Sequence, residues 1–309
     1  MLAPQETYEL FQTLEQLSDE GRSIIYISHK LDDVRALCDR ATLLRNGYVI
    51  DVVDPRKEST RSLGEKMIGQ RFSKTKRRSK VIESGKARLS IRVGDMVPAD
   101  DRVIALKNVY MTLLPGAILG IAGVAGNGQE TLFDILSGEI LVDNPDSIRL
   151  DDEVIGNLNI VERRRRRMVF APEDRLGHSA IPDLMLWENI ILTARENSNI
   201  LTADGRFISR SEAIKLAQSV VDRFDVKTPS ISAKASSLSG GNLQKFLIGR
   251  ELLGQPKVFV VSNPTWGLDT KAQQFIHETF IELADNGASV IMISQDIDEL
   301  FATTCLLYT

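Results

Sequence analysis

The stretch that decides the fold reads Ile118-Leu-Gly-Ile-Ala-Gly-Val-Ala-Gly-Asn-Gly-Gln-Glu-Thr-Leu-Phe-Asp-Ile-Leu136. Its first five residues are almost all apolar, as in a parallel strand that is buried on both faces. Gly123 and Gly128 are separated by four residues, the spacing found in loops whose backbone N–H groups and following helix hold a phosphate. The stretch therefore predicts a strand, an anion-binding loop and a helix within an α/β fold.

The loop departs from the phosphate-loop pattern at two positions. That pattern continues with lysine and then serine or threonine, whereas this sequence has Gln129 and Glu130. The terminal phosphates therefore lack their cation, and a carboxylate replaces the hydroxyl that would hold Mg²⁺. A tight strand-to-helix turn without a ligand is the alternative. The candidate cofactor-binding residues of the loop are Gly123, Gly126, Asn127, Gly128, Gln129, Glu130 and Thr131.

An internal repeat organises the chain. Residues 2–36 aligned on residues 268–302 give eleven identities in thirty-five positions without a gap. Each copy predicts an amphipathic helix, a glycine turn and an apolar strand, and the strands are expected at Ser23–Ile27 and Ser289–Ile293. Helices that alternate with such strands again favour an α/β fold.

Composition excludes several classes of protein. A net charge of −4 argues against a globally basic nucleic-acid binder. The two cysteines cannot form a disulfide framework, and the three histidines show no metal-ligand spacing, so no metal site is expected. Residues 72–86 are basic and predict a solvated linker, with a nucleic-acid or membrane-surface patch as the alternative. The run Arg163–Arg167 predicts an exposed helix end.

Two later segments extend the pattern. The first is Leu238-Ser-Gly-Gly-Asn-Leu-Gln-Lys245, in which Ser239 can cap the following helix and two glycines leave backbone amides open to an anion. The second is Val258-Phe-Val-Val-Ser-Asn-Pro-Thr-Trp-Gly-Leu-Asp269, a short buried strand that ends in a polar turn. Together with the glycine loop, these segments resemble the ATP-binding-cassette ATPases.

The resemblance covers nearly the whole chain. Leu238–Lys245 is similar to the family signature, Val258–Asn263 occupies the Walker B place, and Gly267–Asp269 occupies the D-loop. The sequence looks most like the tandem-cassette subunits of bacterial simple-sugar and nucleoside importers. The implied architecture is a P-loop NTPase fold with the end of a first cassette at 1–71, a linker at 72–86 and a second cassette with a helical subdomain at 87–309.

The resemblance also implies a division of labour between the two cassettes. Two cassettes pair head to tail, and each ATP lies between the phosphate loop of one and the signature of the other. Ser239, Gly240, Gly241 and Asn242 would then contact an ATP on the first cassette, and His29 would serve that site as its catalytic histidine. The phosphate loop of that site, and the residues that hold its Mg²⁺, would belong to about 180 residues absent upstream of Met1.

In the second cassette, the residues that hydrolysis requires are replaced. Ser262 and Asn263 stand where the family has the Mg²⁺-binding aspartate and the catalytic glutamate, and Gln295 stands at the switch histidine. We expect this site to bind nucleotide weakly at most and not to hydrolyse it. Glu173–Arg175 lie at the Q-loop and are candidates for transmitting nucleotide state to the membrane partner, with a surface salt bridge as the alternative.

The sequence alone favours the ATPase subunit of an importer, at the cytoplasmic face of the plasma membrane. Its implied partners are permease subunits and, through them, an external substrate-binding lipoprotein, with no nucleic acid. A non-transport cassette ATPase and a non-catalytic nucleotide-responsive module are the alternatives. The repeat register breaks after Ala302, which suggests a clipped or artificial C-terminal end.

Overall fold

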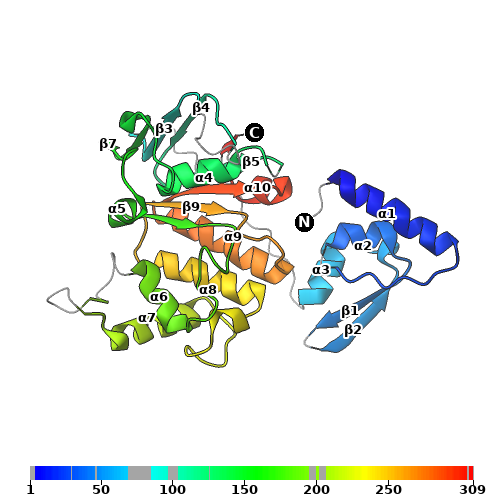
Figure 1. Ribbon diagram of the computed structural model, residues 1–309. Coiled ribbons are helices and arrows are strands. Elements are labelled where there is room, and N and C mark those ends of the chain that lie inside the picture. The colour runs from blue at the N-terminus through cyan, green and yellow to red at the C-terminus, as the bar shows by residue number, and fades with distance from the viewer. Residues whose placement is uncertain are drawn as a thin grey trace. The chain divides into compact units, whose positions relative to one another are not determined.

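The computed structural model describes residues 4–28, 30–45, 47–68, 85–96, 104–124, 126–194, 200–201, 207–304 and 306–308. Two compact units divide the chain (Figure 1). One comprises Met1–Lys76 and Asp269–Gln274, and the other comprises Arg77–Leu268 and Phe275–Thr309. His29 and most of the predicted linker, residues 72–84, lie outside the described residues, and the predicted domain limits stay predictions.

The first unit holds three helices and an antiparallel hairpin among its described residues. They are α1 (Pro4–Asp19), α2 (Leu31–Leu37), β1 (Ala41–Arg45), β2 (Tyr48–Val53) and α3 (Thr60–Ile68). Strands β1 and β2 pair with each other, and Leu31, Leu43 and Leu63 form a small apolar cluster. None of the described residues of this unit lines the pocket described below.

The second unit is built on a parallel five-stranded sheet in the order β11-β5-β10-β9-β8. Its members are β5 (Ile118–Ala122), β8 (Met168–Ala171), β9 (Val258–Ser262), β10 (Ser289–Ser294) and β11 (Leu306–Tyr308). Every residue of β8, β9 and β10 is buried, which explains why these strands read as continuous apolar runs. The sequence predicts β5 and β8 at these bounds and β10 one residue shorter, and it places β9 at the start of a segment that ends in a polar turn.

An antiparallel sheet, six α-helices and most of a seventh, α9, complete the described part of this unit. The sheet has the order β4-β3-β6-β7, from β3 (Leu89–Val93), β4 (Val109–Leu113), β6 (Ile148–Leu150) and β7 (Glu153–Val154). The helices are α4 (Gln129–Ser137), α5 (Ile160–Arg165), α6 (Leu186–Ala194), α7 (Arg210–Arg223), α8 (Gly240–Leu252), α9 (Thr270–Asp285) and α10 (Ile297–Thr303). In Figure 1 the antiparallel strands and the α6–α7 pair lie at opposite ends of this unit. No described helix is both long and apolar enough to cross a membrane.

The internal repeat is visible in the helix bounds. Helices α1 and α9 begin 266 positions apart and also end 266 positions apart, and α2 and α10 do the same. The copies differ in their strands, because β11 pairs in parallel with β5 whereas β1 pairs in antiparallel with β2. The sequence alignment of the two copies therefore locates two pairs of equivalent helices.

The strand predicted at Ser23–Ile27 is absent, and that prediction is wrong. The described residues 22–28 are irregular, and Ile25 and Ile27 are 91% and 93% exposed. The equivalent strand β10 is hydrogen-bonded to β5 on one side and β9 on the other. In the first unit the only described strands are β1 and β2, and these two strands pair with each other. Without a neighbouring strand, an apolar β-prone segment has no ladder to join.

The arginine run is not an exposed helix end throughout, which corrects a second prediction. Arg163 is fully buried, and its guanidinium donates to the carbonyls of Leu136 at 2.8 Å and Leu158 at 2.9 Å. Leu136 belongs to the last turn of α4, so Arg163 satisfies carbonyls that the helix leaves without partners. Burial lowers the pKa of Arg163 to about 10. The helix of this arginine starts at a capping box formed by Asn159 and Glu162.

Candidate functional site

The glycine loop lies between β5 and α4, as predicted. Gly126 and Gly128 have φ angles of 85° and 95°, in the left-handed region that favours glycine. At Gly128 a Cβ atom would also lie 2.7 Å from Leu106 Cδ2. Two features therefore require glycine at the base of α4, namely its backbone conformation and the close approach of a neighbouring side chain.

The side chain of Gln129 turns back into this loop. Its Oε1 accepts a hydrogen bond from the backbone N–H of Asn127 at 3.1 Å, and its Nε2 donates to the carbonyl of Val124 at 3.0 Å. The same carbonyl accepts from Asn127 Nδ2 at 3.1 Å. A Cβ atom on Gly123 would overlap Gln129 Nε2, so this glycine makes room for the amide. The residue in the place of the lysine thus lies inside the loop.

A pocket of about 550 Å³ joins the loop to three other predicted places. It is lined by loop and α4 residues, by the Q-loop place, and by the ends of β9 and β10. The lining residues are Gly126, Gln129, Glu130, Phe133, Asp134, Pro172, Glu173, Asp174, His178, Ser262, Asn263, Trp266, Ile293, Ser294 and Gln295. Gln129, Glu130, Ser262, Asn263 and Gln295, which the sequence analysis identified as replacements, therefore meet in one cavity.

Asn263 is the polar hub of this pocket. Its Nδ2 donates to Glu173 Oε2 at 2.6 Å, and its Oδ1 accepts from the backbone N–H of Gln295 at 3.1 Å. The residue has a φ of 43°, which is uncommon outside glycine and is tolerated best by asparagine and aspartate. Asn263 therefore ties the Q-loop place to the switch place. Because its amide cannot accept a proton at neutral pH, it cannot serve as a general base.

Helix α8 carries the predicted signature at its N-terminus. Ser239 and Gly240 are exposed, while residues 243–252 are buried. The Ser239 side chain does not cap the helix, contrary to the prediction. Its Oγ instead accepts from Asn242 Nδ2 at 2.9 Å, and Asn242 Oδ1 accepts from the backbone N–H of Lys227 at 2.8 Å. Asn242 is thus fixed by its neighbours, and it orients the Ser239 hydroxyl.

Arg175 connects the Q-loop place to the signature and the D-loop. Its guanidinium donates to the carbonyl of Trp266, directly before the D-loop. A Cβ atom on Gly240 would lie 3.2 Å from Arg175 Nη1, so the guanidinium also lies beside the start of α8. Burial lowers the pKa of Arg175, partly offset by Glu173. Residues Glu173–Arg175 were predicted to lie at the Q-loop, but their contacts with Trp266 and Asn263 were not predicted.

Comparison with known families decides the identity of the fold. The model of the ABC transporter family matches residues 106–266, which include the glycine loop, the Q-loop place, the signature and the β9 strand end. The chain belongs to the ABC transporter family.

Known relatives of this ABC chain carry similar names. The glucose import ATP-binding protein of Haloferax volcanii is 34% identical over 303 residues, which are 97% of this chain and 54% of that protein. The nucleoside import ATP-binding protein of Lactococcus lactis is 33% identical over 97% of this chain and 58% of its own length. The chain therefore spans little more than half the length of these curated relatives.

Solved structures agree on the fold. A nucleotide-free ATP-binding cassette from an ABC transporter superposes with a TM-score of 0.59, at 19% identity, over 72% of this chain and 87% of that chain. An ATP-binding cassette determined as a dimer with ADP and phosphate gives the same TM-score at 22% identity. The ABC cassette fold predicted from the sequence, α/β with a P-loop NTPase core, is confirmed.

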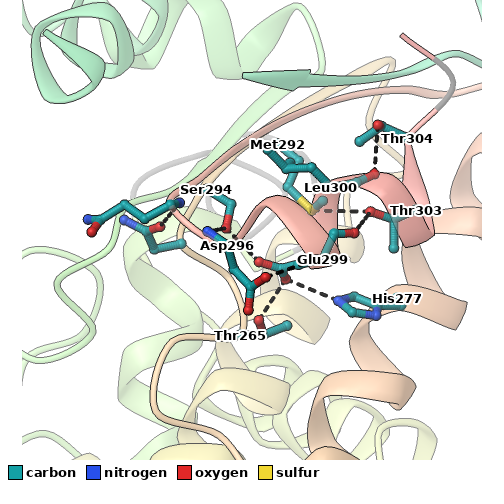
Figure 2. A network of polar contacts seen from close by, with 11 residues as sticks. Thr265, His277, Met292, Ser294, Asp296, Glu299, Leu300, Thr303 and Thr304 are labelled. Atoms are coloured by element: carbon teal, nitrogen blue, oxygen red, sulfur yellow. Dashed lines mark hydrogen bonds and ion pairs between the residues drawn. The ribbon is translucent and has the colours of Figure 1, made fainter. Parts of the chain in front are cut away.

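A second network in this ABC chain was not foreseen from the sequence. The buried carboxylate of Glu299 accepts from Thr265 Oγ1 at 2.6 Å and from Ser294 Oγ at 2.7 Å, and it contacts His277 Nε2 at 3.0 Å (Figure 2). The backbone N–H of Glu299 is held by Asp296, the residue that caps α10. One carboxylate thus links the turn after β9 to the end of β10. The available signal in the sequence was an aspartate followed three residues later by a glutamate, Asp296 and Glu299, the spacing of a helix cap.

The donor set of the pocket does not fit a bound Mg²⁺–ATP. Mg²⁺ prefers several oxygen ligands at close to octahedral positions. No group of three or more His, Cys, Asp or Glu that could hold a metal ion occurs among the residues the structure describes. The lining residues also contain no lysine or arginine to neutralise phosphate charge. We therefore derive no hydrolytic step in this pocket.

Asp134 provides a test of the electrostatics of the pocket. Burial, reinforced by the carboxylates of Glu139 and Glu130, raises the pKa of Asp134 from 3.8 to about 6. Ionisation at neutral pH therefore costs folding free energy, and this cost disappears below the unfolded-state pKa. We expect Asp134→Asn to stabilise the chain by about 1 kcal/mol at pH of about 8, after allowance for partial exposure, and to give almost no gain at about pH 3.

Urea unfolding at the two pH values measures this difference. Asp143→Asn, at an exposed aspartate of the same unit, is the matched control and should change the free energy of unfolding by no more than about 0.5 kcal/mol, as surface substitutions usually do. A stabilisation by Asp134→Asn that does not depend on pH would contradict the assignment.

Proposed function

We propose that this chain is part of the ATP-binding subunit of an importer for nucleosides or simple sugars. The observation that carries the proposal is the convergence of the loop, the Q-loop place, the β9 end and the β10 end on one pocket, with the signature on the same unit. Support also comes from relatives that align over 97% of the chain and are named as import ATP-binding proteins. Whether a sugar or a nucleoside is transported would be determined by the permease and the external binding protein.

In the proposed mechanism, the signature of this chain completes an ATP site on a first cassette. The exposed Ser239 hydroxyl and the free N–H groups at the start of α8 are suited to a γ-phosphate, because a helix N-terminus favours an anion. His29 belongs to the same proposed site as its γ-phosphate sensor. Mg²⁺, held there by residues of the first cassette, would neutralise charge on the transferred phosphoryl group.

The proposed partners are a two-part permease and, through it, an external binding lipoprotein. The subunit would act from the cytoplasmic face of the plasma membrane. Glu173 and Arg175 are suited to transmit the nucleotide state of the cassette to the permease. Glu173 contacts Asn263, whereas Arg175 bonds the Trp266 carbonyl before the D-loop and lies beside Gly240 of the signature. A displacement of residues 173–175 would therefore change the contacts at Asn263 and those near the signature and the D-loop.

ATP turnover tests the proposal. The chain alone should hydrolyse ATP negligibly, because Gln129 and Asn263 replace the lysine and the catalytic glutamate, and no group that could hold a metal ion occurs among the described residues. The chain extended upstream to carry a full first cassette should hydrolyse ATP, and more so with the permease. Robust turnover by the chain alone would contradict the degenerate-site argument. An extended chain that is inactive in the presence of its permease would contradict the importer role.

A non-catalytic nucleotide-responsive module is the second candidate. The absence of lysine and arginine from the pocket lining favours it for the chain as given. Its test is the same pair of proteins: binding of nucleotide without turnover in the extended chain would favour it over the importer motor.

A further inference from the structure

The conformation of Gln129 suggests a role that its sequence position does not. We propose that the Gln129 side chain is an internal occupant of the glycine loop and excludes the polyphosphate of a nucleotide from it. The proposal refines the proposed function, on which it rests only for the identity of the excluded ligand. The loop lacks the lysine of the phosphate-loop pattern, and the side chain of Gln129, which stands in its place, occupies the interior of the loop.

The geometry supports occupation. An anion in such a loop is held by backbone N–H groups that point inward. Here the N–H of Asn127 is already bonded to Gln129 Oε1 at 3.1 Å. The other end of the amide is fixed by the Val124 carbonyl at 3.0 Å. A phosphate would have to break both hydrogen bonds and displace the amide from its position over Gly123.

The loop interior also presents an acceptor where a phosphate requires donors. The Val124 carbonyl accepts from both Gln129 Nε2 and Asn127 Nδ2. If the Gln129 amide left, that oxygen would lose one of its two donors and face the incoming anion. The neutral amide provides both an acceptor for the N–H of Asn127 and a donor for the carbonyl, which a phosphate cannot do. The Gln129 amide therefore satisfies both the N–H donor of Asn127 and the carbonyl acceptor of Val124.

The negative charge around the loop also opposes the binding of a polyphosphate. The lining of the pocket includes the carboxylates of Glu130, Asp134, Glu173 and Asp174, and no lysine or arginine. Burial and neighbouring carboxylates raise the pKa of Asp134 to about 6, as expected where negative charges crowd. A polyphosphate would enter against this field, whereas an uncharged amide is unaffected by it. The steric and electrostatic contributions can be separated by substitution.

The test compares two variants of the full chain with inorganic tripolyphosphate as the probe, without Mg²⁺. Gln129→Ala removes the occupant and keeps the charge. Glu130→Gln removes one carboxylate of the pocket and keeps the occupant. Binding is measured by calorimetry and by the chemical shift of the Asn127 backbone amide. Alanine has the highest helix propensity and Gln129 is only partly buried, so we expect the variant to fold.

We expect the wild-type Asn127 amide to remain unmoved at millimolar tripolyphosphate. In Gln129→Ala the Asn127 amide hydrogen should exchange faster with solvent, and its chemical shift should change during the titration. The affinity for tripolyphosphate should rise about ten- to a hundredfold, because the phosphate no longer competes with two hydrogen bonds of the Gln129 side chain. Glu130→Gln should raise affinity less. Gln129→Met, which fills a similar volume without hydrogen bonds, should fall between the wild type and Gln129→Ala.

Two results would overturn the proposal. One is equal affinity of the wild type and Gln129→Ala. The other is an equal gain from Gln129→Ala and Glu130→Gln, which would mean that charge alone excludes the anion. The probe contains no nucleoside and the assay contains no permease. Failure of this test therefore leaves the importer role intact, and failure of ATP turnover in the extended chain leaves the occupant of the loop intact.

Discussion

Replacement of Ser239 by arginine should reduce ATP hydrolysis about 10²–10³-fold in a chain extended to carry a full first cassette, the loss typical when a preorganised donor to developing charge is removed. The Ser239 hydroxyl accepts from Asn242 and is exposed, so its own proton is available to a ligand. An arginine would place a long side chain over the free N–H groups of α8. Steady-state phosphate release measures the effect.

Ser236→Arg is the matched control. Ser236 is exposed and lies three residues earlier in the same unit, and the change in residue and charge is identical. Hydrolysis by this variant should remain near the wild-type rate. If Ser239→Arg hydrolysed ATP as fast as Ser236→Arg, the signature of this chain would have no part in the competent site.

Replacement of Glu251 by alanine should lower the free energy of unfolding by about 3–5 kcal/mol, the cost of leaving buried charges without their partner. The Glu251 side chain is fully buried in α8 and pairs with Arg164 of α5 and with Arg250, whose Nη2 lies 2.9 Å from Glu251 Oε1. Burial opposes ionisation, but the two guanidinium groups outweigh it and lower the pKa of Glu251. Replacement by alanine removes the carboxylate that both guanidinium groups contact.

Chemical denaturation of both proteins measures the loss. The effect should shrink as the pH falls below the ordinary range of a glutamate, because the stabilisation from a lowered pKa is lost when the carboxylate takes up a proton. Asp183→Ala is the control, since this exposed carboxylate pairs with Lys234 at 2.9 Å and exposed pairs contribute less than about 1 kcal/mol. A loss of similar size in both variants would contradict a special role for the buried cluster.

The parallel sheet was predictable because its strands are buried on both faces. Burial on two faces requires continuous apolar runs. Such runs located β5 and β8 to the residue and β9 within a longer segment. The antiparallel sheet was not predicted. Its strands β6 and β7 have three and two residues, too short for a period of two to be recognised.

The site was predictable as a set of positions, but its contacts were not. Spacing along the chain identified the loop and the ends of β9 and β10, which the fold then brings to one pocket. Spacing does not reveal the rotamer of Gln129, or that Asn263 bonds Glu173 ninety residues away. Arg163 was misjudged because a run of arginines looks uniform, whereas the helix turns one member toward α4 and the core.

Prediction of a strand at residues 23–27 failed for an informative reason. Sequence pattern reports the preference of a segment, and a strand also needs a partner in space. The equivalent residues of the second copy have two partners and form β10. The same pattern therefore produces a strand in one unit and irregular chain in the other.

The exposed isoleucines of that segment affect how the protein behaves at high concentration. Ile25 and Ile27 lie in a short apolar stretch with strong β propensity and no described ladder partner. Unpaired segments of this kind act as templates for strands of other molecules, and they are the usual starting points of cross-β assembly. We therefore expect association of the chain at high concentration to begin in the first unit, at residues that do not line the nucleotide pocket.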